Sequence, residues 1–308
     1  MARQWEAEQT IEPALALQLI QKQFPELGAT KIKLLGTGWD NSAFLVDESL
    51  IFRFPRREIA LPLLETEWCI LPKLAPLIPL PIPVPRWKGS PALGFPWPFI
   101  GYRMLPGVTA CYANLSEKER AQLAEPLGRF LATLHAMPLS IMDGCPITED
   151  NKERIDGSAL TKKIIANFQE LSGLGLLKNE KQLLAVLCHS QNFRAPVSSH
   201  LVQGDFYVRH ILVDDKRHLA GVIDWGDVHI GDPAIDLAIA HSFLPIEAHS
   251  QFRKAYGDIS PETWTLAKLR ALYGSSLLCL FGNHSGDKTL VREGARALNV
   301  MQDSLKEY

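Results

Sequence analysis

Two aspartates and a histidine lie close together in the second half of the sequence, next to short apolar runs. Asp205 and His210 stand in QGDFYVRHILVDD, and Asp224 stands in HLAGVIDWGD. The apolar runs 211–213 and 219–223 predict two strands joined by a turn. A hairpin of this kind would bring the three side chains together on one side. Carboxylates and a metal-capable side chain so arranged can orient a hydroxyl group and hold Mg²⁺ against a triphosphate.

The elements that would position these residues form a β-rich part followed by a helical part. Beyond residue 105, apolar residues recur at helical spacing over most of the chain. The sequence therefore predicts an α+β protein with an N-terminal lobe at residues 1–104 and a C-terminal lobe at residues 105–308. Short apolar runs between turn residues predict strands in the first lobe at 31–35, 43–46, 50–54 and 99–105.

The longest helical pattern covers 116–137. It begins with a capping box formed by Ser116 and Glu119, and Pro126 inside it predicts a kink or a break into two helices. Further helical patterns cover 63–71, 158–173 and 179–190.

The order of these motifs resembles that of a known family. GD, ILVD, GVIDW and GDPAIDLA follow one another between residues 204 and 238, as in the aminoglycoside phosphotransferase family, which is related to the protein kinases. The resemblance implies a protein-kinase-like two-lobe fold, with a small β-rich N-lobe, a larger helical C-lobe and an active site in the cleft between them. It also implies Mg²⁺-dependent transfer of the γ-phosphoryl group of ATP or GTP to a hydroxyl group of a small molecule.

The resemblance gives individual residues their expected roles. Asp205 matches the catalytic aspartate, which accepts or orients the proton of the acceptor hydroxyl. Asp224 matches the aspartate that binds Mg²⁺. His210 stands where the family usually has an asparagine metal ligand, and it resembles the macrolide-kinase branch. A neutral imidazole can ligate a cation, although it is a softer donor than an amide oxygen.

Three further positions that match the family are expected to be mainly structural. Gln203 replaces the histidine that usually lies two residues before the catalytic aspartate, and this departure is expected to matter only slightly. Asp236 resembles a buried aspartate that braces the catalytic loop. His135 resembles a recurrent histidine at the end of a helix.

The N-terminal lobe carries a glycine-containing turn, GTGWDNSAFLV, between two expected strands. The backbone N–H groups at Gly36 and Gly38 could fold over phosphates. Asn41 stands where a third glycine is expected, and the side chains of Asn41 and Ser42 are candidate phosphate contacts. A plain hairpin turn is the alternative interpretation of this segment.

Arg53 occupies the strand position where kinases place the lysine that contacts the α- and β-phosphates. Arginine keeps the charge and offers a planar fork that suits phosphate. Arg56 and Arg57 are alternatives for this contact. Glu67 resembles the helix glutamate that pairs with this cation, and Glu65 is a nearby competitor.

Residues 100–104 resemble the segment that connects the two lobes. Its backbone N–H and C=O groups would bind the purine of the nucleotide, which adds Tyr102 and Met104 to the expected nucleotide site. The side chains of both residues could equally belong to the core.

Composition excludes several classes of protein. The 308 residues carry 32 Lys and Arg against 34 Asp and Glu, a net charge of −2, so neither nucleic acid nor an anionic membrane is an expected partner. No apolar stretch approaches the roughly 18 residues of a membrane span. The charged first ten residues do not resemble a secretory signal. The five widely spaced cysteines are expected to be thiols in a reducing compartment, which favours a cytoplasmic protein.

Three functions compete at this point. The first is an antibiotic-modifying phosphotransferase acting on an aminoglycoside or a macrolide. The second is a metabolic kinase acting on an amino alcohol or a sugar, and the third is a nucleotide-binding protein without phosphotransfer. An acidic pocket would suit an aminoglycoside, and acidic residues occur in 143–150 and near 227. Tyr273, Leu277 and Phe281 would share one helix face, which either packs in the core or contacts the acceptor. The sequence does not indicate an oligomeric state.

Overall fold

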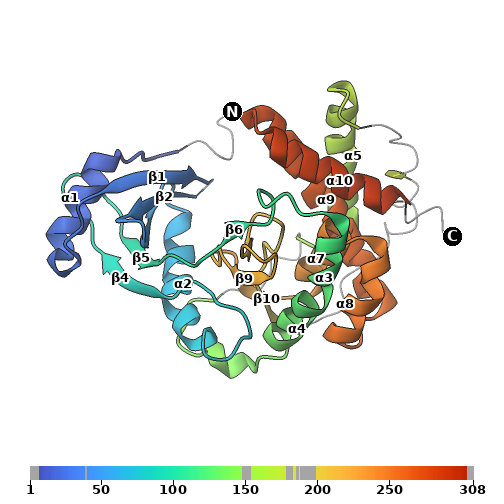
Figure 1. Ribbon diagram of the computed structural model, residues 1–308, viewed down its shortest axis with the longest axis horizontal. Helices are drawn as coiled ribbons and strands as arrows, with labels where there is room; N and C mark the ends of the chain where they lie inside the picture. Colours follow the sequence, from blue (N-terminus) through green and yellow to red (C-terminus); the bar gives the residue numbers. More distant parts are fainter. Residues whose placement is uncertain are drawn as a thin grey trace. The chain divides into compact units, whose positions relative to one another are not determined.

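The computed structural model of the protein describes residues 7–38, 40–147, 154–177, 183–184, 187 and 199–303. The chain forms two compact units. In Figure 1, the sheet of the first unit is blue to green, and most helices of the second are green to red. Unit 1 consists of Met1–Leu77, Pro81–Leu105 and Ser140–Ile147, and unit 2 consists of Ile78–Leu80, Pro106–Leu139 and Thr148–Tyr308.

Unit 1 is built on a five-stranded antiparallel sheet with the strand order β1-β2-β3-β5-β4 (Figure 1). Helix α1 (Pro13–Gln23) precedes the sheet, and helix α2 (Ala60–Leu74) follows β3. The strands are β1 (Ile32–Thr37), β2 (Asn41–Val46), β3 (Leu50–Pro55), β4 (Pro85–Gly89) and β5 (Phe99–Arg103).

Aromatic side chains form the core on one face of this sheet. Successive residues of a strand point to opposite faces, and Phe44, Phe52 and Phe54 share the face that packs with Leu19 of α1. The rings of Phe54 and Phe99 stack with their centroids 4.4 Å apart. The opposite face carries Arg53 together with the apolar side chains of Ile51 and Ile100.

The strands expected in the first lobe correspond to β1, β2, β3 and β5. Strand β4 was not expected, because its sequence PRWKG begins with a proline and shows no apolar alternation. It lies at the edge of the sheet, beside β5. Proline lacks a backbone N–H and is tolerated at an edge or at the first residue of a strand, which is where Pro85 lies.

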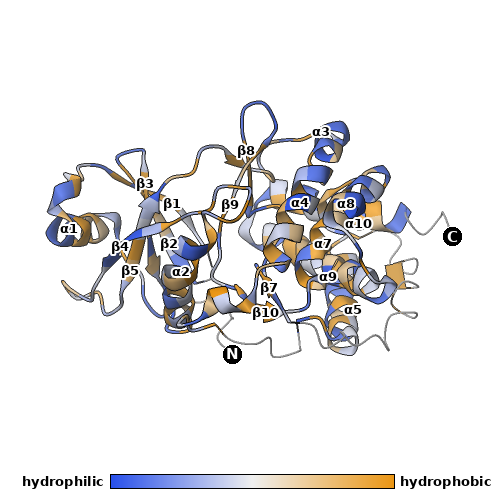
Figure 2. Ribbon diagram, turned by 90° about the horizontal axis from the view of Figure 1, so that it is seen from below, coloured by the Kyte–Doolittle hydropathy of each residue, from blue (hydrophilic) through white to orange (hydrophobic). Residues whose placement is uncertain are grey.

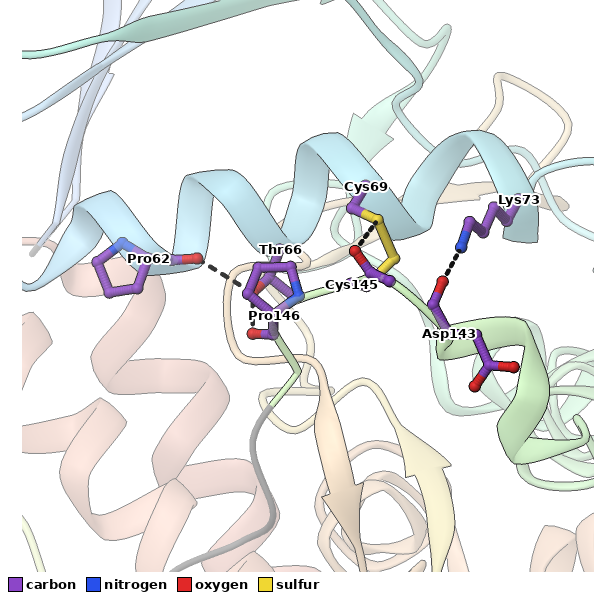
Figure 3. The surroundings of a disulfide bond; sticks show 8 residues. Pro62, Thr66, Cys69, Lys73, Asp143, Cys145 and Pro146 are labelled. Atoms are coloured by element: carbon purple, nitrogen blue, oxygen red, sulfur yellow. Dashed lines mark hydrogen bonds between the residues drawn. A yellow bond between two sulfur atoms is a disulfide. The ribbon is translucent and has the colours of Figure 1, made fainter.

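A disulfide bond joins Cys69 of α2 to Cys145 in the segment Ser140–Ile147 (Figure 3). The expectation that all five cysteines are thiols is therefore wrong for this pair. The two residues are 76 positions apart in the sequence, whereas their Cα atoms lie 5.5 Å apart. No local sequence pattern records so distant a pairing. Among the described residues, Cys111 and Cys279 are free and buried.

Hydrogen bonds on both sides of the disulfide hold the same segment to α2. The hydroxyl of Thr66 donates to the carbonyl of Pro146 at 2.9 Å. The ammonium of Lys73 donates to the carbonyl of Asp143 at 2.7 Å, on the other side of the sulfur atoms in Figure 3. One covalent bond and two hydrogen bonds therefore attach this segment to the helix.

Unit 2 is mostly helical, with two small antiparallel sheets in the orders β6-β8-β9 and β10-β7. Figure 2 shows α3 and α8 in largely hydrophilic colours, whereas every residue of α7 except Ser242 is buried. The helices are α3 (Glu117–Gln122), α4 (Ala124–His135), α5 (Gly157–Gly173), α7 (Ala234–Phe243), α8 (His249–Tyr256), α9 (Pro261–Ser285) and α10 (Lys288–Asp303). The strands are β6 (Val108–Thr109), β7 (His200–Val202), β8 (Ile211–Val213), β9 (Leu219–Val222) and β10 (His229–Gly231). Within the described part of the chain, short 3₁₀ helices lie at Pro25–Leu27, Leu139–Met142 and Ile246–Ala248.

The expected helix signals are confirmed in unit 2. Ser116 and Glu119 form the capping box of α3. The chain then breaks at Leu123, and α4 begins at Ala124. Pro126 therefore lies in the first turn of α4, where a missing N–H costs no hydrogen bond.

Two other expectations have different outcomes. The helix expected at 158–173 is α5, whereas most of the helix expected at 179–190 lies outside the described residues. Among the residues that the structure describes, no helix has the length and apolarity of a membrane span.

Candidate active site

Three candidate residues of unit 2 come together beside the hairpin of β8 and β9. His210 precedes β8 and Asp224 follows β9, and the N–H of Ile223 donates to the His210 carbonyl at 2.9 Å. The His210 Nε2 atom lies 3.2 Å from Asp224 Oδ2, and its Nδ1 atom lies 3.6 Å from Asp205 Oδ2. The imidazole therefore stands between the two carboxylates, and the structure gathers the three side chains that the sequence singled out.

A buried aspartate of α7 holds the backbone just before Asp205. Asp236 Oδ2 accepts a hydrogen bond from the N–H of Gln203 at 2.7 Å, and its Oδ1 accepts one from the N–H of Gly204 at 2.9 Å. The His135 Nε2 atom, at the end of α4, lies 3.1 Å from Asp236 Oδ2. Hydrogen bonds to a buried carboxylate are strong. These contacts hold the backbone before Asp205 in position, as expected for Asp236. His135 contacts this aspartate and so has a structural role.

Gln203 connects the backbones of the two catalytic candidates. Its Oε1 atom accepts from the N–H of Asp205 at 2.8 Å, and its Nε2 atom donates to the carbonyl of Asp224. The residue is fully buried. A side-chain amide donates and accepts at the same time, so one residue sets the spacing between two loops. The sequence interpretation understated this position, because the partners of Gln203 cannot be seen in its neighbours along the chain.

Two unusual backbone conformations shape the same loops. Gly204 has φ +86°, and a Cβ atom there would lie 2.2 Å from the carbonyl oxygen of Asp227, so only glycine fits. Asp224 has φ 59°, which is uncommon for a residue with a side chain. Such conformations persist where the surrounding structure enforces them, and they are concentrated at functional sites.

The local charges shift the pKa values of this cluster. The surrounding protein displaces part of the water around Asp205 and raises the pKa of its carboxyl to about 6, and the charges of Asp227 and Asp224 act in the same direction. The charges of His210 and Arg270 oppose this shift. For His210, burial lowers the pKa, but Asp224 and Asp205 outweigh burial and the net pKa is raised. The histidine and the two carboxylates therefore stabilise opposite charges on one another.

The donor set of this cluster fits Mg²⁺. The side chains of Asp205 and Asp224 are 39% and 46% exposed, so solvent reaches both carboxylates. Mg²⁺ prefers oxygen donors and is usually held by one or two carboxylates, with water and phosphate oxygens completing its shell. Among the described residues, no group of three or more His, Cys, Asp or Glu side chains is arranged as a metal centre by itself. A cation shared with a bound phosphate is consistent with both observations.

In unit 1, Arg53 and Glu67 form a buried ion pair. The Arg53 Nη1 atom donates to both carboxylate oxygens of Glu67, at 2.8 and 2.7 Å. Arg53 lies on β3 opposite Ala43 and Ile100, and Glu67 lies on α2. The expected pairing of these two side chains is therefore present. The competitor Glu65 instead pairs with Lys88.

The two alternative arginines have other partners near the β1–β2 turn. Arg56 Nη1 donates to the carbonyl of Gly38 at 2.5 Å. Arg57 Nη1 lies 3.3 Å from Asp40 Oδ1. Both side chains therefore stabilise the turn, whereas Arg53 lies within the sheet.

The glycine-containing turn connects β1 to β2. The N–H of Gly38 donates to the carbonyl of Asn41 at 2.9 Å, and Gly36 lies opposite Ala43 in the ladder. Ala43 of β2 lies opposite Arg53 of β3, so the two side chains share one face of the sheet. Asn41 lies two positions before Ala43 on the same strand and therefore points to that face as well. Ser42 points to the aromatic core and is buried. Of the two side chains, Asn41 is therefore the stronger candidate for phosphate.

The segment expected to bind a purine runs along β5. Tyr102 pairs with Ile51 of β3 and with Pro85 of β4, so it lies inside the sheet and is buried. The N–H of Met104 donates to the carbonyl of Ser49 at 2.8 Å, and its side chain is exposed. Any purine contact from Met104 would therefore use its carbonyl group rather than its N–H.

The sequence matches the profile of the phosphotransferase enzyme family over residues 31–272. Among curated proteins, it is similar to an aminoglycoside 3'-phosphotransferase of Streptomyces ribosidificus, with 28% identity over 159 residues. This match covers 50% of the chain and 57% of the relative. The matched part of the chain thus spans just over half the length of that protein.

Solved structures show the same fold. The GDP complex of an aminoglycoside 2'-phosphotransferase-IIIa superposes with a TM-score of 0.68 at 22% identity, over 96% of this chain and 99% of the other. A macrolide 2'-phosphotransferase of type I gives a TM-score of 0.60 at 21% identity, over 94% and 98% of the two chains. The expected kinase-like fold, with a small β-rich part and a larger helical part, is confirmed.

Proposed function

We propose, on the premise that the chain belongs to the phosphotransferase enzyme family, that it transfers the γ-phosphoryl group of ATP or GTP to a hydroxyl group of a small molecule. The observation that carries this proposal is the arrangement of Asp205, His210 and Asp224. Two partly exposed carboxylates flank one imidazole. A buried network through Gln203 and Asp236 holds them in place. Such a network suits chemistry that depends on positioning.

Each of the three candidate residues of unit 2 has a proposed role in the reaction. Asp205, with a pKa near 6, is mostly ionised at neutral pH. It would accept a hydrogen bond from the acceptor hydroxyl and align its oxygen with the phosphorus atom. Asp224 would hold Mg²⁺ through its carboxylate oxygens, and His210 would be a second ligand once its imidazole has released its proton. The bound cation would neutralise charge on the phosphate oxygens.

The residues of unit 1 are proposed to bind the nucleotide. Arg53, oriented by Glu67, would contact the α- and β-phosphates. Backbone groups at Gly36 and Gly38 and the side chain of Asn41 would contact phosphate oxygens. Ser42 would anchor the start of β2 beside them by packing toward the aromatic core, and the segment of Tyr102 and Met104 would lie along the purine.

The decisive test is nucleotide turnover by the Asp205→Asn variant, with Mg²⁺, either ATP or GTP, and a panel of small-molecule alcohols as acceptors, against transfer to water as the background. We expect turnover to fall by about 10²- to 10⁴-fold, the usual contribution of a positioned acid or base. Nucleotide affinity should stay nearly unchanged. Asp215→Asn is the matched control, because Asp215 is an exposed carboxylate in the turn of the same hairpin. Wild-type turnover in Asp205→Asn would refute the catalytic role of Asp205, and no turnover even in the wild type would leave a nucleotide-binding protein without phosphotransfer.

The acceptor can be narrowed with cells that express the protein. An aminoglycoside or a macrolide as acceptor predicts a rise in drug resistance that disappears with Asp205→Asn. A metabolic small-molecule kinase is the second candidate. This second candidate is favoured by the ion pair between Arg154 and Asp227. Asp227 follows Asp224 closely in the sequence, and its carboxylate is already paired with an arginine instead of being open to a cationic acceptor. Unchanged drug susceptibility together with Asp205-dependent nucleotide turnover would support that candidate.

The proposed compartment is the cytoplasm, where nucleoside triphosphates are abundant. Disulfides are rare in a reducing cytoplasm, so the Cys69–Cys145 bond provides a direct check. Alkylation of thiols in freshly lysed cells should label both cysteines if the protein resides there. Complete protection of both would contradict the placement.

A further inference from the structure

Four side chains of α9 form a half-buried stripe. Arg270, Tyr273, Leu277 and Phe281 are spaced three to four residues apart, so they lie on one face of the helix, and each is partly exposed. Neighbouring faces of α9 are buried against α5, α7 and α10. We call these four residues the α9 stripe.

Cations lie over both aromatic rings of the α9 stripe. The guanidinium of Arg270 and the ammonium of Lys163 lie 5.3 and 5.9 Å from the ring centroid of Tyr273. The guanidinium of Arg209 lies 5.5 Å from the ring of Phe281. Contacts of this kind are weak at exposed sites. They orient the cations without neutralising their charge.

Arg209 and Arg270 connect the α9 stripe to the catalytic loop. Arg209 immediately precedes His210 in the sequence, so its contact with Phe281 places one end of the stripe beside the loop. Arg270, near the other end, is close enough to Asp205 that its charge acts on the carboxyl. The stripe therefore lies along the side of the loop that carries the catalytic aspartate.

The carboxylate that could attract an amine is already paired. Arg154 Nη2 donates to Asp227 Oδ1 at 2.9 Å. Of the acidic residues noted in 143–150, Asp143 belongs to unit 1, and 148–150 lie outside the described residues. Around Tyr273, the described charged contacts are the cations Arg270 and Lys163, whereas at the other end of the stripe Arg209 lies near the carboxylate of Asp287.

We propose, as a refinement that rests on the proposed phosphotransfer, that the α9 stripe with Lys163 selects an acceptor that carries an anionic group on a ring framework. The ring would pack on Leu277, and a carboxylate would lie between Arg270 and Lys163. An acceptor ammonium in the same place would lose water and face two cations. Like charges without compensation disfavour binding, so a polycationic acceptor is selected against.

The test uses the full chain with Mg²⁺ and nucleotide, and three matched probes: 4-(hydroxymethyl)benzoate, the corresponding carboxamide and the corresponding benzylamine. The measured quantity is the dissociation constant of each probe by titration calorimetry. We expect the benzoate to bind at least about tenfold more tightly than the benzylamine, because a like charge next to a cation is unfavourable. Equal or tighter binding of the benzylamine, or no binding of the benzoate at millimolar concentration, would overturn the proposal.

Two variants locate the charge preference. Arg270→Gln and Lys163→Gln should each reduce the ratio between the two dissociation constants by several-fold. Lys162→Gln and Arg292→Gln are the controls, because both side chains are exposed and lie outside the stripe. Lys163 is exposed as well, so its variant is expected to fold normally. A preference that survives both variants would place the anion elsewhere and overturn the proposal.

Failure of this proposal can be told apart from failure of the phosphotransfer. Nucleotide turnover with Asp205→Asn is measured on the same preparations without any probe. Asp205-dependent turnover combined with preference for the benzylamine would reject the anionic acceptor alone. Turnover that does not depend on Asp205 would reject the proposed catalytic site, and the refinement that rests on that site falls with it.

Discussion

The candidate residues of the two units are held in different ways. In unit 2 they lie between 203 and 236 and are connected by hydrogen bonds to buried backbone groups. In unit 1 they extend from 36 to 104, over four strands and one helix, and the buried ion pair between Arg53 and Glu67 is their strongest described link. The catalytic loop is thus fixed by a few hydrogen bonds to one buried aspartate of α7, whereas the nucleotide-binding residues depend on the packing of a whole sheet and on α2.

Asp236→Ala should have the largest effect. It leaves the N–H groups of Gln203 and Gly204 without their acceptor in the interior, and it removes the charge next to His135. We expect a loss of about 3–5 kcal/mol in the free energy of unfolding, the usual cost of breaking a buried charged network. Denaturant unfolding measures it, with Asp258→Ala as an exposed control. Equal stability of the two variants would show that the loop is not held as described.

Reduction of the disulfide should have the next largest effect, and it concerns unit 1. A cross-link that closes a loop of 76 residues stabilises by at most about 4.5 kcal/mol in the chain-entropy model. A thiol reductant should therefore lower the melting temperature of the wild type and leave that of Cys145→Ser unchanged. A reductant that shifts both proteins equally would mean that another group responds.

Glu67→Gln tests the dependence of the nucleotide-binding residues on α2. The variant keeps the shape of the side chain but removes the charge that orients Arg53. We expect a loss of about 1–3 kcal/mol in stability, as for a hydrogen bond to a buried charged group, together with a raised KM for nucleotide. Glu65→Gln is the control, because Glu65 pairs with Lys88 at the surface. If both variants raise KM equally, the ion pair has no special part in nucleotide binding.

The same contrast explains what the sequence could and could not predict. Asp205, His210 and Asp224 could be found because their strands, turn and carboxylates lie within a short stretch of chain. The expected strands of unit 1 also follow from local apolar runs between turn residues. Such features depend on neighbours in the sequence, which periodicity and turn chemistry record.

Pairings between distant parts of the chain left no such record. The Cys69–Cys145 bond and the contact of His135 with Asp236 join residues 76 and 101 positions apart. The short strands β7 and β10 pair only with each other across the catalytic loop. The importance of Gln203 depends on two backbone groups, one of them in another loop. Each of these features needs the folded chain to bring its partners together.

A pH titration of stability should give the smallest effect, and it separates the catalytic cluster from the helical core of unit 2. His241 of α7 is buried beside His249 and Arg253 of α8 and Lys268 of α9. Burial first, and then the charges of His249 and Lys268, hold its pKa well below the ordinary value of 6.5. The folded state therefore keeps His241 neutral at a pH where the unfolded chain binds a proton.

The sign of the pH dependence follows from this difference. As the pH falls below about 6.5, His241 binds a proton in the unfolded state but not in the folded state. The free energy of unfolding therefore decreases by up to about 1.4 kcal/mol per pH unit. Asp205 acts in the opposite direction: its folded pKa is raised to about 6, so the folded state binds a proton first as the pH falls through that value, and stability is gained. His241→Gln should flatten the decrease, and Asp205→Asn should steepen it. His218→Gln, which removes an exposed histidine, is the control and should leave the pH dependence of stability as it is in the wild type. Identical pH profiles for His241→Gln and the wild type would mean that acid destabilises the protein through the catalytic loop rather than through the helical core. The proposed difference between these two regions would then be wrong.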